Sequence, residues 1–153
     1  MNTYGRHVIM EYRGCDSAVL NDIVRIEALL LLAVQKSKAT PIQSMLHPFQ
    51  PQGVSGVILL QESHISIHTW PELGYAALDF YTCGICDPEA GHDVLRHGLG
   101  ATSAELMVLD RGLRPEASIV LAKHFQEHSA NDAALETIRT TAPGCFVSAV
   151  GGA

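Results

Sequence analysis

The chain has 153 residues, 47% of them hydrophobic and 17% charged, and its net charge is −6. One domain of this length buries a core without disulfide bonds, and the composition excludes a disordered or collagen-like chain. The acidic balance predicts no nucleic-acid partner and no anionic membrane surface. The longest apolar run, residues 28–34, is far shorter than the roughly 20 residues that cross a bilayer. Four cysteines are too few for a disulfide scaffold, so we expect a soluble, cytoplasmic protein.

Hydrophobic periodicity predicts strands and helices in the order β-α-β-β-β-β-α-β. After a first strand, Asp16 and Ser17 are N-cap candidates for a long helix that ends near residues 36–38. Asp87, Pro88 and Glu89 begin a second helix, which ends near residues 98–100. The strands are expected over residues 7–12, 40–49, 54–60, 63–69, 75–82 and 104–109, with one more over 119–125.

This order predicts an α+β fold, a two-layer sandwich in which two helices cover one face of a mostly antiparallel sheet. We expect the domain to span residues 1–126. Residues 127–153 are rich in Ala, Thr and Gly, with few large apolar residues before 145–150. They are expected to form a tail to which no structure is assigned.

The polar residues that could carry chemistry are concentrated between Gln61 and Gly84. In the strand over 63–69, alternation puts His64 and His68 on the face opposite Ser63. Histidine transfers protons near neutral pH, and a cysteine with a tuned pKa acts as an acid or a nucleophile. A strand and its hairpin partner are expected to bring His68 and Cys83 together. From the residues alone, a solvated strand face with a small core cysteine is an equally good interpretation.

One string of residues resembles a known family. The segments 62–64, 68–72 and 82–84 read Glu-Ser-His, His-Thr-Trp-Pro-Glu and Thr-Cys-Gly. They resemble the processing and active-site segment of the prokaryotic S-adenosylmethionine decarboxylase proenzymes, the short form without an obligatory metal. The resemblance continues upstream in residues 5–7, 47–49 and 53–57, and covers residues 5–112.

The resemblance implies a cofactor made from the chain itself. A decarboxylase needs an electron sink that no side chain offers, so a carbonyl group is required. In this family the Ser63 hydroxyl would attack the carbonyl of Glu62, and β-elimination would cut the chain between residues 62 and 63. The second chain would then begin with a pyruvoyl group. The amine of S-adenosylmethionine would form a Schiff base with it and lose CO₂, giving the aminopropyl donor for spermidine biosynthesis.

Matching residues take the family's roles. Ser63, His68 and Cys83 are the implied catalytic set: His68 accepts the proton during β-elimination, and Cys83 reprotonates the substrate carbon. Glu62 and Ser55 join Ser63 and His68 in processing, where the Ser55 hydroxyl hydrogen bonds an intermediate.

The resemblance also implies a substrate site and an assembly. Phe49 stacks on the adenine ring, Glu72 binds the ribose hydroxyls, and Trp70 lies beside them. No metal is expected. The family's usual assembly implies a homodimer of cleaved protomers, with sheets packed together and sites near the interface.

Three other functions remain open. The same machinery could decarboxylate a free amino acid such as arginine or ornithine, although Phe49 and Glu72 would then have no adenine or ribose to bind. A non-catalytic homologue that binds a nucleotide-like ligand would require failed processing. Cys83 and Cys86 form a CxxC that suits a redox dithiol or half of a zinc site, but no second CxxC is present.

Overall fold

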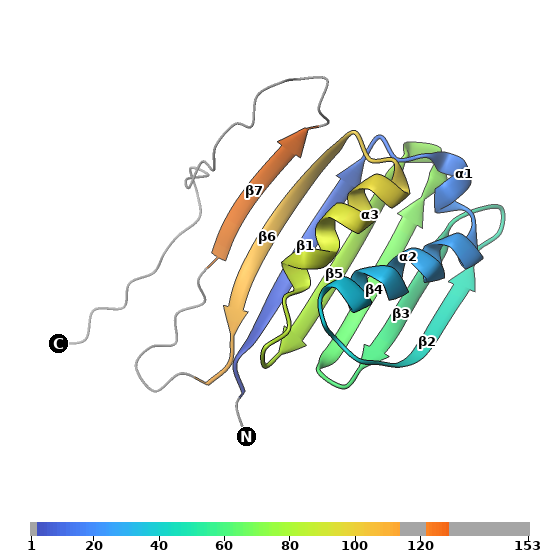
Figure 1. Cartoon of the computed structure of the whole chain (residues 1–153). Helices are drawn as coiled ribbons and strands as arrows, with labels where there is room; N and C mark the ends of the chain where they lie inside the picture. Colours follow the sequence, from blue (N-terminus) through green and yellow to red (C-terminus); the bar gives the residue numbers. More distant parts are fainter. Residues whose placement is uncertain (1–2, 114–121, 129–153) are drawn as a thin grey trace.

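One antiparallel sheet organises the protein (Figure 1). The computed structural model describes residues 3–113 and 122–128. In this part of the chain the sheet has seven strands, in the spatial order β2-β3-β4-β5-β1-β6-β7. The strands are β1 (Gly5–Arg13), β2 (Pro41–Pro48), β3 (Val54–Leu60), β4 (Ser63–Trp70), β5 (Tyr75–Cys83), β6 (Ser103–Arg111) and β7 (Ala122–His128).

Helices cover one face of this sheet, with α2 and α3 packed against each other (Figure 1). The α-helices of the described residues are α1 (Ser17–Leu20), α2 (Ile23–Lys36) and α3 (His92–Leu99). Two short 3₁₀ helices, η1 (Pro71–Leu73) and η2 (Pro88–Gly91), lie in connections. The expected α+β sandwich, with helices on one side of an antiparallel sheet, is confirmed.

The two faces of the sheet follow from side-chain alternation along each strand. The side chains that point toward the helices are buried, and each large one contributes about 1.5–3 kcal/mol through burial. On the central strands they include Val8, Met10, Tyr12, Ile65, Ile67, Leu78 and Phe80. The other face, which we call the open face, has no helix over it in Figure 1. Its side chains on β1, β3, β4, β5 and β6 include His7, Ser55, His64, His68, Asp79 and Arg111.

The prediction of one long first helix was wrong in one respect, because the structure has two helices there, α1 and α2. Asp16 caps α1, and its carboxylate accepts from the Ala18 amide at 2.8 Å. Asp22 then caps α2 by accepting from Val24 and Arg25 at 3.0 and 3.1 Å. A second N-cap stops the first helix even though the apolar spacing continues across the break.

Most strands lie within two residues of the predicted bounds. The second predicted helix corresponds to η2 followed by α3, and together they begin and end where the capping residues indicated. The last strand differs more. β7 runs to His128, so the expected domain boundary at residue 126 falls inside it, and residues 119–121 of the expected strand lie outside the described residues. Residues 129–153 of the expected tail also lie outside them.

Candidate active site

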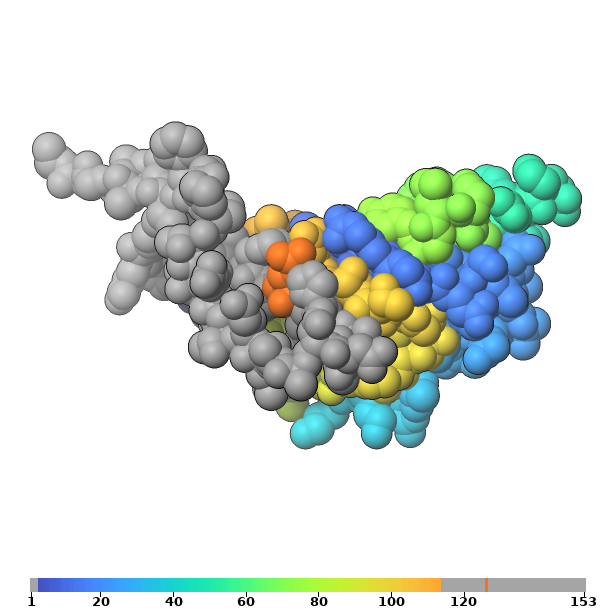
Figure 2. Space-filling model, turned by 90° about the horizontal axis from the view of Figure 1, so that it is seen from above, coloured from blue at the N-terminus to red at the C-terminus, as the bar shows by residue number. Residues whose placement is uncertain are grey.

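The residues singled out in the sequence lie at opposite ends of the open face. We call Glu62, Ser63 and Cys83 the Ser63 end, and Ser55, His68, Phe49, Trp70 and Glu72 the His68 end. The first forms where the β3–β4 turn meets the last residue of β5. The second forms where β4 leads into η1 and the 49–53 loop leads into β3. Figure 2, seen from above this second end, shows η1 (green) and that loop (teal) side by side at one corner.

The peptide bond between Glu62 and Ser63 is held on its carbonyl side. The backbone N–H of Cys83 donates to the Glu62 carbonyl oxygen at 3.1 Å. The Glu62 side chain accepts from the Thr40 amide at 2.9 Å and from its hydroxyl at 3.1 Å. An N–H aimed at a carbonyl oxygen stabilises negative charge that develops there during nucleophilic attack. The geometry therefore favours addition at this carbonyl.

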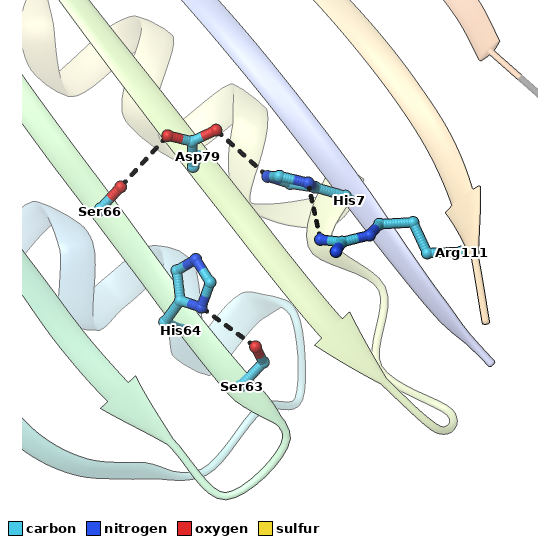
Figure 3. A network of polar contacts seen from close by, with 6 residues as sticks. All are labelled: His7, Ser63, His64, Ser66, Asp79 and Arg111. Atoms are coloured by element: carbon cyan, nitrogen blue, oxygen red, sulfur yellow. Dashed lines mark hydrogen bonds and ion pairs between the residues drawn. The ribbon is translucent and has the colours of Figure 1, made fainter. Parts of the chain in front are cut away.

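Ser63 has an unusual backbone conformation directly after that bond. Its φ is 155°, a value that residues other than glycine rarely adopt. In a regular strand Ser63 and His64 would point to opposite faces. Here the Ser63 hydroxyl instead lies 3.1 Å from Nδ1 of His64 (Figure 3). The strained residue therefore turns its hydroxyl toward a histidine of the open face.

The His68 end contains a second hydroxyl–imidazole pair. Ser55 on β3 lies directly across from His68 on β4, and Ser55 Oγ is 2.6 Å from His68 Nδ1. The His68 ring also lies beside the Trp70 indole, with centroids 6.2 Å apart. Within one chain the structure therefore places Ser55 beside His68 and at the far end of the β3–β4 pair from Ser63, whose processing it is expected to support.

Aromatic and carboxylate groups lie in the segments that adjoin that pair, at the end of β4, in η1 and in the 49–53 loop. Phe49 and Trp70 are 49% and 38% exposed, so both rings offer a free face to a ligand. Glu72, in η1, accepts a hydrogen bond from the Gln52 side chain at 3.0 Å. The Phe49 amide donates to the Gly53 carbonyl at 2.8 Å, which closes the loop that carries Gln52. Two exposed rings beside a carboxylate suit a ligand with a flat base and neighbouring hydroxyls.

The expected meeting of His68 and Cys83 was wrong. In the β4–β5 register His68 faces Ala77, whereas Ser63 faces Thr82, one residue before Cys83. His68 follows Ser63 by five positions along one strand, which at about 3.3 Å per residue is about 17 Å. A hairpin brings together residues at equal distances from its turn, and His68 and Cys83 lie at different distances from the β4–β5 turn. One chain therefore keeps the two ends apart.

A polar network that the sequence did not indicate crosses the open face between β4 and β6 (Figure 3). His7 on β1 lies 3.2 Å from an Asp79 carboxylate oxygen, and an Arg111 guanidinium nitrogen lies 3.3 Å from its Nδ1. Ser66 donates to the other Asp79 oxygen at 3.4 Å. Arg111 also stacks 4.3 Å over the Tyr81 ring. These residues come from four strands, and only the register places them together.

The network determines the state of His7. Arg111 can only donate, so Nδ1 of His7 accepts and Nε2–H donates to Asp79. Burial lowers the pKa of His7 below its usual 6.5, and Arg111 adds to this while Asp79 opposes it. His7 is therefore a neutral ring in the folded protein at pH 7.

Comparison with known proteins agrees with the motif. The sequence profile of the S-adenosylmethionine decarboxylase family matches residues 6–112. The S-adenosylmethionine decarboxylase proenzyme of Geobacillus sp. (strain WCH70) is 50% identical over 115 residues, 75% of this chain and 93% of that protein. Its namesake in Shouchella clausii (strain KSM-K16) is 44% identical over 116 residues, 75% of this chain and 90% of that one. The chain belongs to the S-adenosylmethionine decarboxylase family.

A solved structure agrees as well. The crystal structure of the adenosylmethionine decarboxylase from Aquifex aeolicus matches with a TM-score of 0.68 at 38% identity, over 78% of this chain and 99% of that one. The expectations of this family and of a decarboxylase are confirmed. The matched region spans both ends of the open face and the strands from β1 to β6.

The thiols of this S-adenosylmethionine decarboxylase family member are free where the structure describes them. Cys83 and Cys86 are both half-buried. Burial raises the pKa of Cys86, and Glu62 and Cys83 raise it further. Near neutral pH this keeps Cys86 a thiol rather than the thiolate that redox exchange or zinc binding requires.

Within residues 3–113 and 122–128, no group of three or more His, Cys, Asp or Glu side chains could hold a metal ion. No helix in the same ranges is both long and apolar enough to cross a membrane.

Proposed function

We propose that this chain is a self-processing, pyruvoyl-dependent decarboxylase that converts S-adenosylmethionine to its decarboxylated form and CO₂ for spermidine biosynthesis. The observation that carries this proposal is the Glu62–Ser63 junction. It combines a strained serine, a carbonyl that accepts the Cys83 N–H, and a hydroxyl turned toward a histidine. This donor set fits the formation of a pyruvoyl group from Ser63.

Self-processing needs two steps at this junction. In the first, Ser63 Oγ bonds to the Glu62 carbonyl carbon and the C–N bond breaks, which leaves an ester and a free Ser63 amine. The Cys83 N–H stabilises the oxyanion of the tetrahedral state. In the second, a base removes the Ser63 α-proton and Glu62 leaves as a carboxylate. Water then replaces the nitrogen, which departs as ammonia.

In the decarboxylation step the pyruvoyl carbonyl supplies the electron sink for the bond that breaks as CO₂ leaves. The residues of this chain do the rest. Glu72 accepts hydrogen bonds from the ribose hydroxyls, and Phe49 and Trp70 cover the adenine. The Cys83 thiol, next to the pyruvoyl position, returns a proton to the substrate carbon. A reducing cytoplasm suits this role because it keeps that thiol free.

A homodimer would unite the two ends. A two-fold axis that lies between two facing sheets, perpendicular to their strands, reverses the strand direction of one sheet relative to the other. The Ser63 end of each protomer then faces the His68 end of its partner, which makes two complete sites. The open face suits such packing, because it exposes Met45, Val57 and Leu59 on its β2–β3 side. We propose this arrangement, with His68 of the partner subunit as the base in β-elimination.

The intact mass of the denatured protein tests the proposal. We expect two chains, residues 1–62 and 63–153, with the second lighter by one ammonia than its sequence. CO₂ release should be strong with S-adenosylmethionine and weak with arginine or ornithine. An uncut chain of 16.5 kDa would contradict the proposed processing. Preference for a free amino acid would contradict the proposed substrate.

A further inference from the structure

The side chain that touches the nucleophile is His64. Its Nδ1 lies 3.1 Å from Ser63 Oγ, within hydrogen-bond distance. His68 of the same chain is about 17 Å away along β4, at 3.3 Å per residue. Among the described residues of this chain, His64 is therefore the base that reaches the Ser63 hydroxyl.

The backbone makes this contact at a cost. Adjacent residues of a regular strand cannot join their side chains, because they point to opposite faces. The φ of 155° at Ser63 removes that restriction. Such conformations cost about 1–3 kcal/mol and persist where the surroundings impose them. Here the β3–β4 turn and the pairing of Ser63 with Leu60 and Thr82 fix the backbone on both sides.

The surroundings suit a ring that accepts a proton. His64 lies against two rings, with its centroid 6.5 Å from His7 and 6.2 Å from Tyr81. Burial and the nearby Arg111 guanidinium lower the pKa of His7 and keep its ring neutral, although Asp79 acts in the opposite direction. A proton gained by His64 therefore meets no second imidazolium there. In this position Nδ1 of His64 is directed at the Ser63 hydroxyl (Figure 3).

We infer that His64 is the general base of the first processing step, taking the Ser63 hydroxyl proton as Oγ attacks the Glu62 carbonyl. This inference rests on the proposed self-processing. The Oγ–C bond forms as the proton moves to Nδ1. The imidazolium then gives the same proton to the departing Ser63 nitrogen as the C–N bond breaks. The step is an isomerisation of amide to ester, and it consumes no other reactant. It separates two histidine roles: His64 acts before the ester forms, and His68 after it.

Hydroxylamine distinguishes the two roles, because it cleaves an ester readily and leaves an amide intact. The test uses full-length chains with His64→Ala, His64→Asn or His68→Ala, followed by mass spectrometry with and without hydroxylamine. His64→Asn keeps a hydrogen-bonding atom near the position of Nδ1 but cannot take up a proton. His97→Ala, a change of an exposed histidine on α3, is the matched control.

We expect both His64 variants to be cut at least about 100-fold more slowly than the native chain, and the uncut chains to resist hydroxylamine as amides. Uncut His68→Ala should instead be split by hydroxylamine between residues 62 and 63. Added imidazole should restore cutting of His64→Ala, which shows that the variant is folded, and His97→Ala should be cut as the native chain is.

Three results would overturn the inference. The first is normal cutting of His64→Ala. The second is normal cutting of His64→Asn, which would reduce His64 to a positioning residue. The third is hydroxylamine cleavage of the uncut His64 variants. A native chain that is never cut would contradict the proposed function instead, so the two failures are distinguishable.

Discussion

The Ser63 end and the His68 end of the open face are built from different parts of the chain. At the Ser63 end the backbone takes part directly, through a strained φ, a carbonyl and an N–H from the neighbouring strand, beside the side chains of Ser63 and Cys83. At the His68 end the functional groups are side chains, which project from a loop, a strand end and a 3₁₀ turn. Under the proposed function, the first end changes its own covalent structure and the second end holds the substrate.

This difference explains why a single strand carries both. A motif of ten residues is contiguous in sequence, but as a strand it is extended, and its two halves are about 17 Å apart at 3.3 Å per residue. The distance lets one open face hold two half-sites without steric conflict. In the homodimer that we propose, a second copy completes each half-site. Substitutions at each end therefore test the two ends separately.

Removal of the Ser63 hydroxyl should have the largest effect. Ser63→Ala has no nucleophile, so we expect no cleavage and no CO₂ release from S-adenosylmethionine. Because the His68 end is unchanged, calorimetric titration should still detect S-adenosylmethionine binding. Cleavage of this variant between residues 62 and 63 would show that another group attacks the Glu62 carbonyl.

A change of the Cys83 side chain should have a smaller effect. Cys83→Ser replaces the proposed acid by a much weaker one, and we expect CO₂ release to fall by about 10²–10⁴-fold. The backbone N–H on the Glu62 carbonyl is retained, so cleavage should slow less than CO₂ release does. Parallel mass and CO₂ measurements check this.

Cys86→Ser is the matched control for Cys83→Ser, since it removes the other thiol of the CxxC. We expect little change in either rate. A large loss of CO₂ release in Cys86→Ser would instead favour a dithiol function.

Glu72→Gln should affect binding at the other end. A hydrogen bond to a charged group contributes about 1.5–3 kcal/mol, so we expect KM for S-adenosylmethionine to rise about 10- to 100-fold. The mass of the cleaved chains should be unchanged apart from the substitution. Glu27→Gln on α2 is the matched control. Unchanged KM in Glu72→Gln would remove the carboxylate from the substrate site.

A change on the helix-covered side should have the smallest effect. Asp22→Ala removes the cap of α2, which lowers the free energy of unfolding by about 1 kcal/mol. Urea unfolding at matched protein concentration measures it, since a dimer's stability depends on concentration. Both ends of the open face should function normally. An Asp22→Ala protein that fails to cleave would show that the two faces are not independent.

Local patterns predicted most of the fold. Period-two alternation located β1 and β4, whose side chains alternate between a buried and an open face, and a continuous apolar run located β3. The split between α1 and α2 was missed because apolar residues keep their helical spacing across Asn21 and Asp22. In that context Asp22 reads as an ordinary helical residue, and only the structure shows it as a cap.

The site was predictable as a set of residues but not as an arrangement. The motif indicated Ser63, His68 and Cys83, yet strand register decides which of them meet, and register is a non-local property. The rise per residue of a strand alone could have shown that Ser63 and His68 of one chain are too far apart to touch. His7, Asp79 and Arg111 could not have been grouped, because their contacts join strands far apart in sequence.

The most direct test of the two half-sites is complementation between variants. Ser63→Ala and His68→Ala chains, with different affinity tags, are co-expressed in equal amounts, and the dimer carrying both tags is isolated. In the proposed arrangement, Ser63 of the His68→Ala chain faces His68 of the partner subunit in that dimer. We expect the His68→Ala chain to be cut there, and to remain uncut when expressed alone. If it stays uncut in the mixed dimer as well, His68 acts within its own chain and the shared site is contradicted.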